Sequence, residues 1–337
     1  METAPAGGPH RPGDQHPFDG TPARGQDPGH GHGAGDGAGH GHGGDGGHGH
    51  GAGPGHGGGD AAEWAAWAEL LDLDGEVFRA YLAGLTAWVR ELAGDRPGGR
   101  IIDLGCGTGT GTFALARNFE GAEVIALDAS ADLLGRLTAT ARDLGLAGRV
   151  RALQADLDGA WPGLGAGSVD VAWASMSLHH LADPDAALAR VLAVLRPGGL
   201  LAVAETDDPF VRFLPDDIGL GRRGLEERLH AELAAGTGAE MPELRADWDD
   251  RLKRAGFALV ARRPFALRLT PPLPAAAGRF AQLWMERTRS RVADRLAGDD
   301  LAVLDTLIGD GPDGVRHRDD LIVAASRTAW VAQRPGG

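Results

Sequence analysis

The spacing of apolar residues along the chain becomes regular near residue 100. Short apolar runs typical of buried strands alternate there with segments whose apolar residues recur every three or four positions, as in helices. Strands are predicted at 101–103, 123–128, 150–156, 169–176 and 200–205. Helices are predicted at 112–119, 130–145 and 184–195. This alternation predicts an α/β fold with a doubly wound, mostly parallel sheet and helices on both faces.

Two further regions flank this alternating core. Before it, residues 61–73 and 75–92 have helical periodicity, with bulky apolar side chains at regular intervals. The RPGG sequence at 196–199 predicts a turn before the fifth strand. After the core, helices are predicted at 221–236, 241–256 and within 275–309, and strands at 257–269 and within 318–334.

Residues 1–60 have a different composition, dominated by Gly, His, Asp and Pro. A segment with so few large apolar side chains cannot offset the entropy of ordering, so we expect it to be disordered. Paired histidines could bind Zn²⁺, Ni²⁺ or Cu²⁺ weakly without a fixed geometry. The candidate ligands are His30, His32, His40, His42, His48 and His50. We favour the alternative that this is a low-complexity tail with incidental metal affinity.

The most informative motif is RIIDLGCGTGTG at 100–111, a predicted strand followed by a glycine-rich loop and a helix. Its glycine spacing does not match G-x-G-x-x-G of dinucleotide-binding folds, because residues 110 and 112 are both Thr. No lysine follows the loop, so the phosphate-binding P-loop pattern fails as well. What remains is an acid-x-G-x-G-x-G motif. An acid in the loop repels a pyrophosphate and suits a ligand with an ammonium group.

This motif resembles motif I of the class I S-adenosylmethionine-dependent methyltransferases. The resemblance covers roughly residues 61–334 and is most specific over 100–206. It implies S-adenosylmethionine as cofactor, a sheet of seven strands with the seventh antiparallel, and a methyltransferase domain over 61–335. Residues 61–95 would form a helical lid, 100–206 the cofactor-binding core, and 207–335 a C-terminal part with a helical insertion.

The resemblance also assigns roles at the first strand and at the lid. Asp103 would hold the methionine ammonium group, directly or through water, and Ser175 at the end of the fourth strand would line the site. Four loop residues would present their backbone to the same end of the cofactor: Gly105, Cys106, Gly107 and Gly109. The lid would place Phe78, Arg79 or Tyr81 near the ligand, although packing of the aromatic rings on the sheet is the interpretation we favour for any single residue.

Two further acids follow the second and third predicted strands. By resemblance, Asp128 would accept hydrogen bonds from both ribose hydroxyls, with Ala129 beside it. Asp156 would accept from the adenine amino group, and Leu157 would donate its backbone N–H to the ring. The alternatives are that Asp128 caps the next helix, where Ser130 already fits, and that Asp156 stabilises its own turn.

The sequence offers several candidate bases for the methyl acceptor. His179 and His180 follow the fourth strand, and a positioned histidine can remove a proton near neutral pH. In the resembled family such a pair often lines the cofactor or packs against the next helix. Acidic residues after the fifth strand are rivals: Glu205, Asp207 and Asp208. Proximity alone could also suffice for the reaction.

Composition narrows the class of partner. The net charge of −14 argues against a nucleic-acid backbone, and a Pro-Pro-Tyr-like box is missing after the fourth strand. Cys106 is the single cysteine, which fits a reducing compartment. No apolar run is long enough to span a membrane and no signal peptide is recognisable, so we expect a soluble cytoplasmic protein.

Together these features predict a methyltransferase that transfers a methyl group to an O, N or C nucleophile of a small molecule. Three other functions stay open at this point. One is a nicotinamide-dependent oxidoreductase on a similar fold, against which the glycine spacing and Asp103 both count. Another is a metal-handling or binding protein that uses the His-rich tail and carries an inactive domain. The third is a regulator that binds the cofactor without turning it over.

Overall fold

The structure is a computed structural model that describes residues 61–94, 99–237 and 246–336. The predictions of a disordered tail and of weak metal binding by its histidines concern residues 1–60, which lie outside this range.

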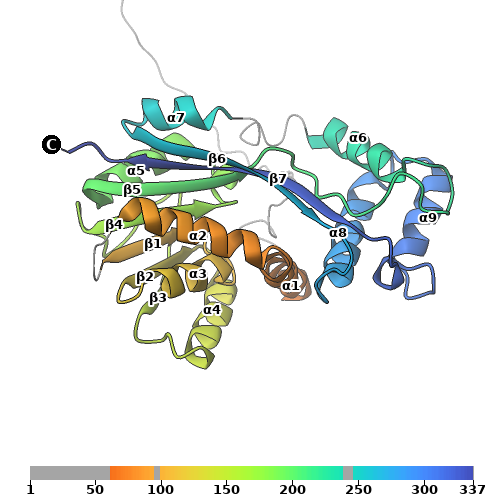
Figure 1. The fold of residues 1–337 in the computed structure, drawn as a ribbon, viewed down its shortest axis with the longest axis horizontal. Helices are drawn as coiled ribbons and strands as arrows, with labels where there is room; N and C mark the ends of the chain where they lie inside the picture. The colour runs from red at the N-terminus through yellow and green to blue at the C-terminus, as the bar shows by residue number, and fades with distance from the viewer. Residues whose placement is uncertain (1–60, 95–98, 238–245, 337) are drawn as a thin grey trace, which may run out of the picture. The chain divides into compact units, whose positions relative to one another are not determined.

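The described chain folds around a seven-stranded sheet (Figure 1). Its strands are β1 (Arg100–Leu104), β2 (Glu123–Asp128), β3 (Val150–Gln154), β4 (Val169–Ser175), β5 (Leu195–Thr206), β6 (Ala258–Leu269) and β7 (Val323–Gln333). The helices of the first half are α1 (Ala61–Val77), α2 (Arg79–Ala93), α3 (Thr110–Asn118), α4 (Ala131–Asp143) and α5 (Pro184–Val194). Those of the second half are α6 (Leu225–Thr237), α7 (Trp248–Arg254), α8 (Ala277–Val292) and α9 (Gly298–Ile308).

The strands lie in the order β3-β2-β1-β4-β5-β7-β6. Strands β1 to β5 are parallel, and β7 runs antiparallel between β5 and β6. The predicted α/β fold and the antiparallel seventh strand are therefore confirmed. The order reverses between β1 and β4, which are neighbours in the sheet but far apart in sequence. Ligands of open α/β sheets bind at such a switch point, at the carboxyl ends of the strands.

Successive residues of each parallel strand point into two separate cores. In β1, Ile101 packs with the helices α1 to α4, whereas Ile102 packs with α5 and α7. Because both faces of the sheet are covered, the central strands β1, β2 and β4 are largely apolar, whereas the edge strand β3 carries the exposed Arg151 and Gln154. The same register aligns the ends of β1, β2 and β4, so residues that follow these strands meet at one edge.

The boundary between the first two helices differs from the prediction. Helix α1 continues through Gly75 and ends at Val77, four residues beyond the predicted end at residue 73. A Cβ at Gly75 would lie 2.3 Å from Thr110 Cγ2. Gly75, which was expected to begin the second helix, therefore lies within α1 at a point of close contact with the start of α3.

The predicted turn before the fifth strand is wrong. The RPGG segment at 196–199 lies inside β5, where the pairing register with β4 shifts between Val169 and Val171. The Gly198 N–H donates a hydrogen bond of 2.9 Å to the carbonyl of Arg334, near the end of β7. The helices predicted within 275–309 are α8 and α9. Among the described residues, no helix combines the length and apolarity that crossing a membrane requires.

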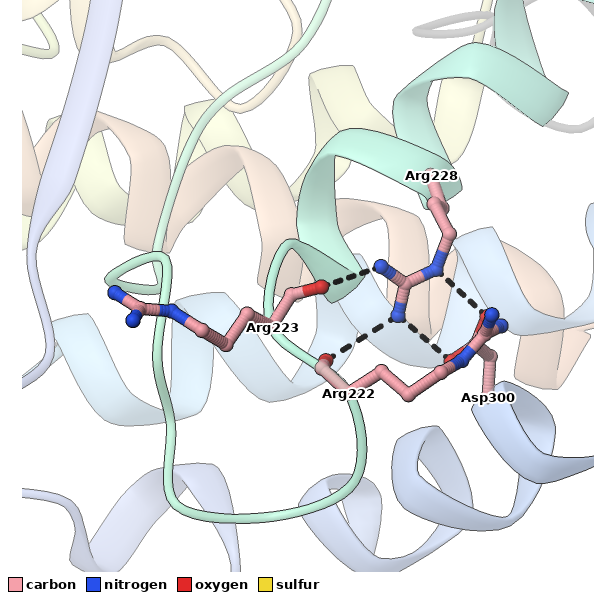
Figure 2. A network of polar contacts seen from close by, with 4 residues as sticks. All are labelled: Arg222, Arg223, Arg228 and Asp300. Atoms are coloured by element: carbon pink, nitrogen blue, oxygen red, sulfur yellow. Dashed lines mark hydrogen bonds and ion pairs between the residues drawn. The ribbon is translucent and has the colours of Figure 1, made fainter.

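The C-terminal helices are joined by a charged network around Asp300 (Figure 2). This carboxylate lies on α9, is 2% exposed, and accepts two hydrogen bonds of 2.8 Å from Arg228 of α6 and a third from Arg222. Arg228 also donates to the backbone carbonyls of Arg222 and Arg223. One buried acid thus fastens α6, α9 and the loop that precedes α6, and the Arg228 hydrogen bonds lower its pKa.

We expect Asp300→Ala to lower the free energy of unfolding by about 2 kcal/mol in a denaturant titration. The loss leaves two guanidinium groups without their carboxylate, and the partial exposure of Arg228 limits the cost. The matched control is Asp305→Ala on the same helix. Its pair with Arg289 is solvent-exposed, so the unfolding midpoint should stay at the wild-type value. Equal effects of the two substitutions would contradict this assignment.

Candidate active site

The loop between β1 and α3 forms a tight bend in which three positions are occupied by glycine. Gly105, Gly107 and Gly109 have φ angles of 70°, 55° and 96°, in the left-handed region that residues with a Cβ rarely adopt. A Cβ at Gly105 would lie 2.6 Å from Ser177 Cβ, after strand β4. The loop therefore needs glycine both for its backbone conformation and for its contact with the neighbouring strand end.

The amide groups of this loop are largely used by the fold itself. The N–H groups of Gly105 and Cys106 both donate to the Leu127 carbonyl at 2.9 Å. The Gly107 N–H donates to Asp128 Oδ2 at 2.9 Å. A loop that cradles a pyrophosphate offers such N–H groups to the ligand. Here the fold consumes them, which agrees with the mismatch of the glycine spacing to the dinucleotide pattern.

Asp103 lies at the base of the loop. Its side chain is buried, and Oδ2 accepts a hydrogen bond of 2.6 Å from Thr112 Oγ1 on α3. Burial raises the pKa of Asp103 to about 7, although the Thr112 hydrogen bond opposes the rise. A cation next to this carboxyl would stabilise its ionised form. Thr112 was not singled out from the sequence, where nothing distinguishes it from other helix threonines.

Asp128 connects the end of β2 to the loop. Oδ2 accepts from Gly107, and Oδ1 accepts from the Ser130 N–H at 2.9 Å. The Ser130 hydroxyl in turn caps α4 by accepting from the Leu133 N–H, as predicted. Asp128 is thus not the cap of α4. Its carboxylate orients the glycine loop, and the half-buried Ala129 follows it at the same edge.

The segment after β3 is joined to the segment after β4. Asp156 is exposed, and its Oδ1 accepts from the Asp158 N–H at 2.9 Å, which is the turn-stabilising interaction raised as an alternative. Asp158 accepts from the N–H groups of Ala182 and Asp183. Leu157 is buried, with its Cδ1 3.7 Å from the position of a Cβ at Gly105. The structure therefore places Leu157 against the loop and Asp156 at the surface.

The end of β4 carries backbone strain next to unsatisfied polar atoms. Met176 follows Ser175 and has a φ of 56°, the only positive value at a non-glycine residue in the described part of the chain. The Oγ atoms of Ser177 and of Thr108 in the loop are buried, with no hydrogen-bond partner among the described residues. Buried hydroxyls without partners are rare, and here one lies in the glycine loop and the other lies on the segment after β4 that contacts Gly105.

The two candidate base histidines are in different environments. His179 is 4% exposed, and its Nδ1 is hydrogen-bonded to Glu205 Oε2 at the end of β5. Glu205 Oε1 also accepts from the Leu178 N–H at 3.1 Å. His180 is exposed, with its ring centroid 4.0 Å from that of His179. The acid and the buried histidine thus fix the loop after β4, and His180 is the more accessible of the two rings.

Helix α1 covers the glycine loop. The Leu71 side chain would contact a Cβ at Gly107 at 3.1 Å, and Gly75 abuts Thr110. Three acids of α1 bind arginines of three other elements: Glu69 pairs with Arg279 of α8, Asp72 with Arg136 of α4, and Asp74 with Arg327 of β7. The sequence pattern showed the helix but not these pairs, because the partner arginines lie far away along the chain.

The three predicted lid residues differ in their exposure to solvent. Arg79 is exposed, whereas Phe78 and Tyr81 are buried. Phe78 packs edge-on against Phe280 and Tyr81 against Phe265, with ring centroids 6.1 and 5.0 Å apart.

The site contains several carboxylates, but in the described residues they are not grouped as a metal site would require. Asp103 and Asp128 lie on adjacent strands around the loop, and Glu205 lies two strands away from Asp103. Within the described residues, no group of three or more His, Cys, Asp or Glu side chains could hold a metal ion. Burial raises the pKa of the Cys106 thiol well above its usual value, so this residue fills space in the loop. These acids suit a cationic ligand with hydroxyl groups.

Comparison with known proteins agrees with this geometry. The model of the family described as "Methyltransferase domain" matches residues 101–199, which run from β1 to the start of β5. Residues 101–199 are therefore similar to a methyltransferase domain, and they contain the glycine loop and the strand ends described above.

Named relatives align with the same part of the methyltransferase domain. The trans-aconitate 2-methyltransferase of Deinococcus radiodurans is 38% identical over 115 residues, which are 34% of this chain and 41% of that protein. The ubiquinone/menaquinone biosynthesis C-methyltransferase of Shewanella halifaxensis is 35% identical over 120 residues, 35% of this chain and 47% of that protein. The matches therefore span less than half of these relatives' length.

Among solved structures, a putative methyltransferase from Bacillus halodurans aligns with a TM-score of 0.48 and 16% identity. The alignment covers 74% of this chain and 98% of that one.

The raised pKa of Asp103 gives a prediction for pH dependence. At pH 6 about a tenth of a carboxyl group with a pKa near 7 is ionised, and at pH 8 about nine tenths. An ammonium group binds the ionised form, so the affinity for S-adenosylhomocysteine should fall about tenfold from pH 8 to pH 6 in calorimetric titrations. Asp103→Asn should remove this pH dependence while its melting temperature shows that it is folded. Equal affinity of the wild-type protein at both pH values would contradict contact between Asp103 and the amine.

Proposed function

We propose that this protein transfers the methyl group of S-adenosylmethionine to a small-molecule acceptor. The observation that supports this best is the glycine loop, whose N–H groups are bound to Leu127 and Asp128 while its buried acid, Asp103, has a raised pKa. This loop is unsuited to a pyrophosphate and suited to a cationic amine. The family match over 101–199 supports the same reaction.

Each part of the methyl donor has a candidate partner in the proposal. Asp103 faces the ammonium group, and the loop backbone from Gly105 to Gly109 lies along the methionine part. Asp128 accepts the ribose hydroxyls beside Ala129. The adenine ring lies against Leu157, with Asp156 near its amino group. Ser175, the last residue of β4, lines the site. Helix α1 closes over the loop through Leu71 and acts as the lid.

The transfer is an in-line displacement at the methyl carbon. The electron pair of the acceptor forms the new bond, and the sulfonium sulfur takes the pair of the broken carbon–sulfur bond, leaving S-adenosylhomocysteine. An acceptor that carries a proton loses it, and His180 is the candidate base because it is exposed while His179 is engaged with Glu205. The acceptors of the relatives, which include trans-aconitate, make a small metabolite the proposed class of substrate.

Calorimetric titration tests the cofactor assignment directly. We expect S-adenosylmethionine to bind and NAD to show no binding. Asp128→Ala should weaken binding of S-adenosylmethionine at least tenfold, or by ~1.4 kcal/mol, because a charge-assisted pair with the ribose and the anchor of Gly107 are both lost. The control is Asp132→Ala, which removes an exposed carboxylate from the first turn of α4 and should leave the affinity unchanged. Binding of NAD alone would overturn the proposal.

Deletion of residues 1–60 tests whether the His-rich segment takes part. We expect the shortened protein to incorporate label from methyl-labelled S-adenosylmethionine into a cell extract at the wild-type rate, because the proposed site lies wholly within residues 61–336. Loss of incorporation with retained binding of S-adenosylhomocysteine would instead give this segment a role in the reaction.

A further inference from the structure

A buried arginine lies at the carboxyl edge of the sheet and has no role in the cofactor assignment. Arg327 of β7 pairs in register with Thr206, the last residue of β5 and the neighbour of Glu205. The residue is 7% exposed. Its guanidinium lies 4.8 Å from the centroid of the Phe78 ring and 5.2 Å from that of Tyr81. Two aromatic rings thus lie within 5.2 Å of the guanidinium carbon, and the N–H groups of this buried side chain still need hydrogen-bond acceptors.

Arg327 uses few of these donors within the protein. Its Nη2 donates one hydrogen bond of 2.9 Å to Asp74 Oδ1, and the Asp74 side chain is 33% exposed. Two other arginines that join elements of this fold bind their carboxylates through two nitrogens, in the pairs Arg228–Asp300 and Arg279–Glu69, whereas Arg136 binds Asp72 through one. Since Arg327 binds Asp74 through a single nitrogen, its other N–H groups remain available for a further acceptor. Burying a guanidinium is costly unless its N–H groups are hydrogen-bonded.

A second buried donor lies beside this arginine. Tyr81 is 8% exposed, and its hydroxyl has no hydrogen-bond partner among the described residues. Burial raises the pKa of Tyr81 to about 12, although the Arg327 guanidinium beside the hydroxyl opposes the rise, so the hydroxyl keeps its proton at neutral pH. Contact with Phe265 fixes the ring. Two underused donors on different elements therefore lie together below α1, and a ligand that satisfies both must bring acceptor atoms.

We propose that Arg327 and Tyr81 bind a carboxylate group of the methyl acceptor. This deepens the proposed function, on which it rests, by naming the chemical class of the substrate. A carboxylate is planar and carries a single negative charge, and it can take two parallel N–H bonds from a guanidinium and a third bond from a phenol. A phosphate dianion fits less well, because Asp74 already offsets part of the arginine charge.

Asp74 has a definite part in this arrangement. Its carboxylate holds the guanidinium in place from the cover helix α1, and it also repels an incoming anion. Removing the Asp74 charge should therefore strengthen binding of a carboxylate, whereas removing the Arg327 charge should abolish it. If the pair served only to hold α1 on the sheet, both changes would act in the same direction.

The experiment measures the affinity of the protein, saturated with S-adenosylhomocysteine, for acetate, benzoate, succinate and citrate. Each acid is compared with its amide, and inorganic phosphate is included. We expect at least one acid to bind at least tenfold more tightly than its amide and more tightly than phosphate. Four variants are then titrated with that acid: Arg327→Gln, Tyr81→Phe, Asp74→Asn and the control Arg263→Gln.

We expect the substitutions to change the affinity for the acid in opposite directions. Arg327→Gln should weaken binding of the acid at least tenfold and Tyr81→Phe several-fold, whereas Asp74→Asn should strengthen it. Arg263 also stacks on Phe265, at 5.2 Å, but is exposed, so its replacement should change nothing. Melting temperatures and the affinity for S-adenosylhomocysteine show whether each variant is folded.

Three results would overturn the proposal. They are a wild-type protein that binds none of the acids, phosphate bound more tightly than every acid, and equal weakening by Asp74→Asn and Arg327→Gln. If S-adenosylhomocysteine itself does not bind, the proposed function fails. The carboxylate titrations are then made on the ligand-free protein, where the same pattern of signs supports or overturns the anion site separately.

Discussion

The arrangement of the site depends on the hydrogen bond from the Gly107 amide to Asp128. This bond joins the loop after β1 to the end of β2, and the Leu127 carbonyl reinforces it by accepting from the two preceding amides. Glycine is required because the loop has to turn through left-handed conformations while it touches Ser177 and Leu157. The consequence is chemical. Once the N–H groups are consumed, the loop is left with carbonyls and a buried acid, and it favours cations over phosphates.

The sheet and the loop could be predicted from the sequence because their signals are local. Strands buried on both faces read as apolar runs, and the acid-led glycine motif is contiguous between Asp103 and Gly109. Local signals also misled at two places. Gly75 was expected to begin the second helix but lies within α1 in contact with Thr110, and the turn predicted at 196–199 is part of β5.

The remaining features of the site arise from contacts between segments that are far apart in the sequence. Such contacts cannot be predicted from the pattern of a single sequence. His179 and His180 are adjacent in sequence, yet only His179 is buried against Glu205, and this distinction requires the position of β5. Arg327 lies 253 residues beyond its partner Asp74 and looks like any other polar residue of a terminal strand. The hydrogen bond from Thr112 to Asp103 likewise depends on how α3 leaves the loop.

The loop at the β1–β4 switch point, with Asp103 at its base, is proposed to bind S-adenosylmethionine and its product. The decisive measurement is a crystal structure of the protein with S-adenosylhomocysteine. We expect the amino group of the ligand on the side of Asp103 and the ribose hydroxyls at hydrogen-bonding distance from Asp128. A ligand bound elsewhere, or with its ribose turned away from Asp128, would contradict this assignment.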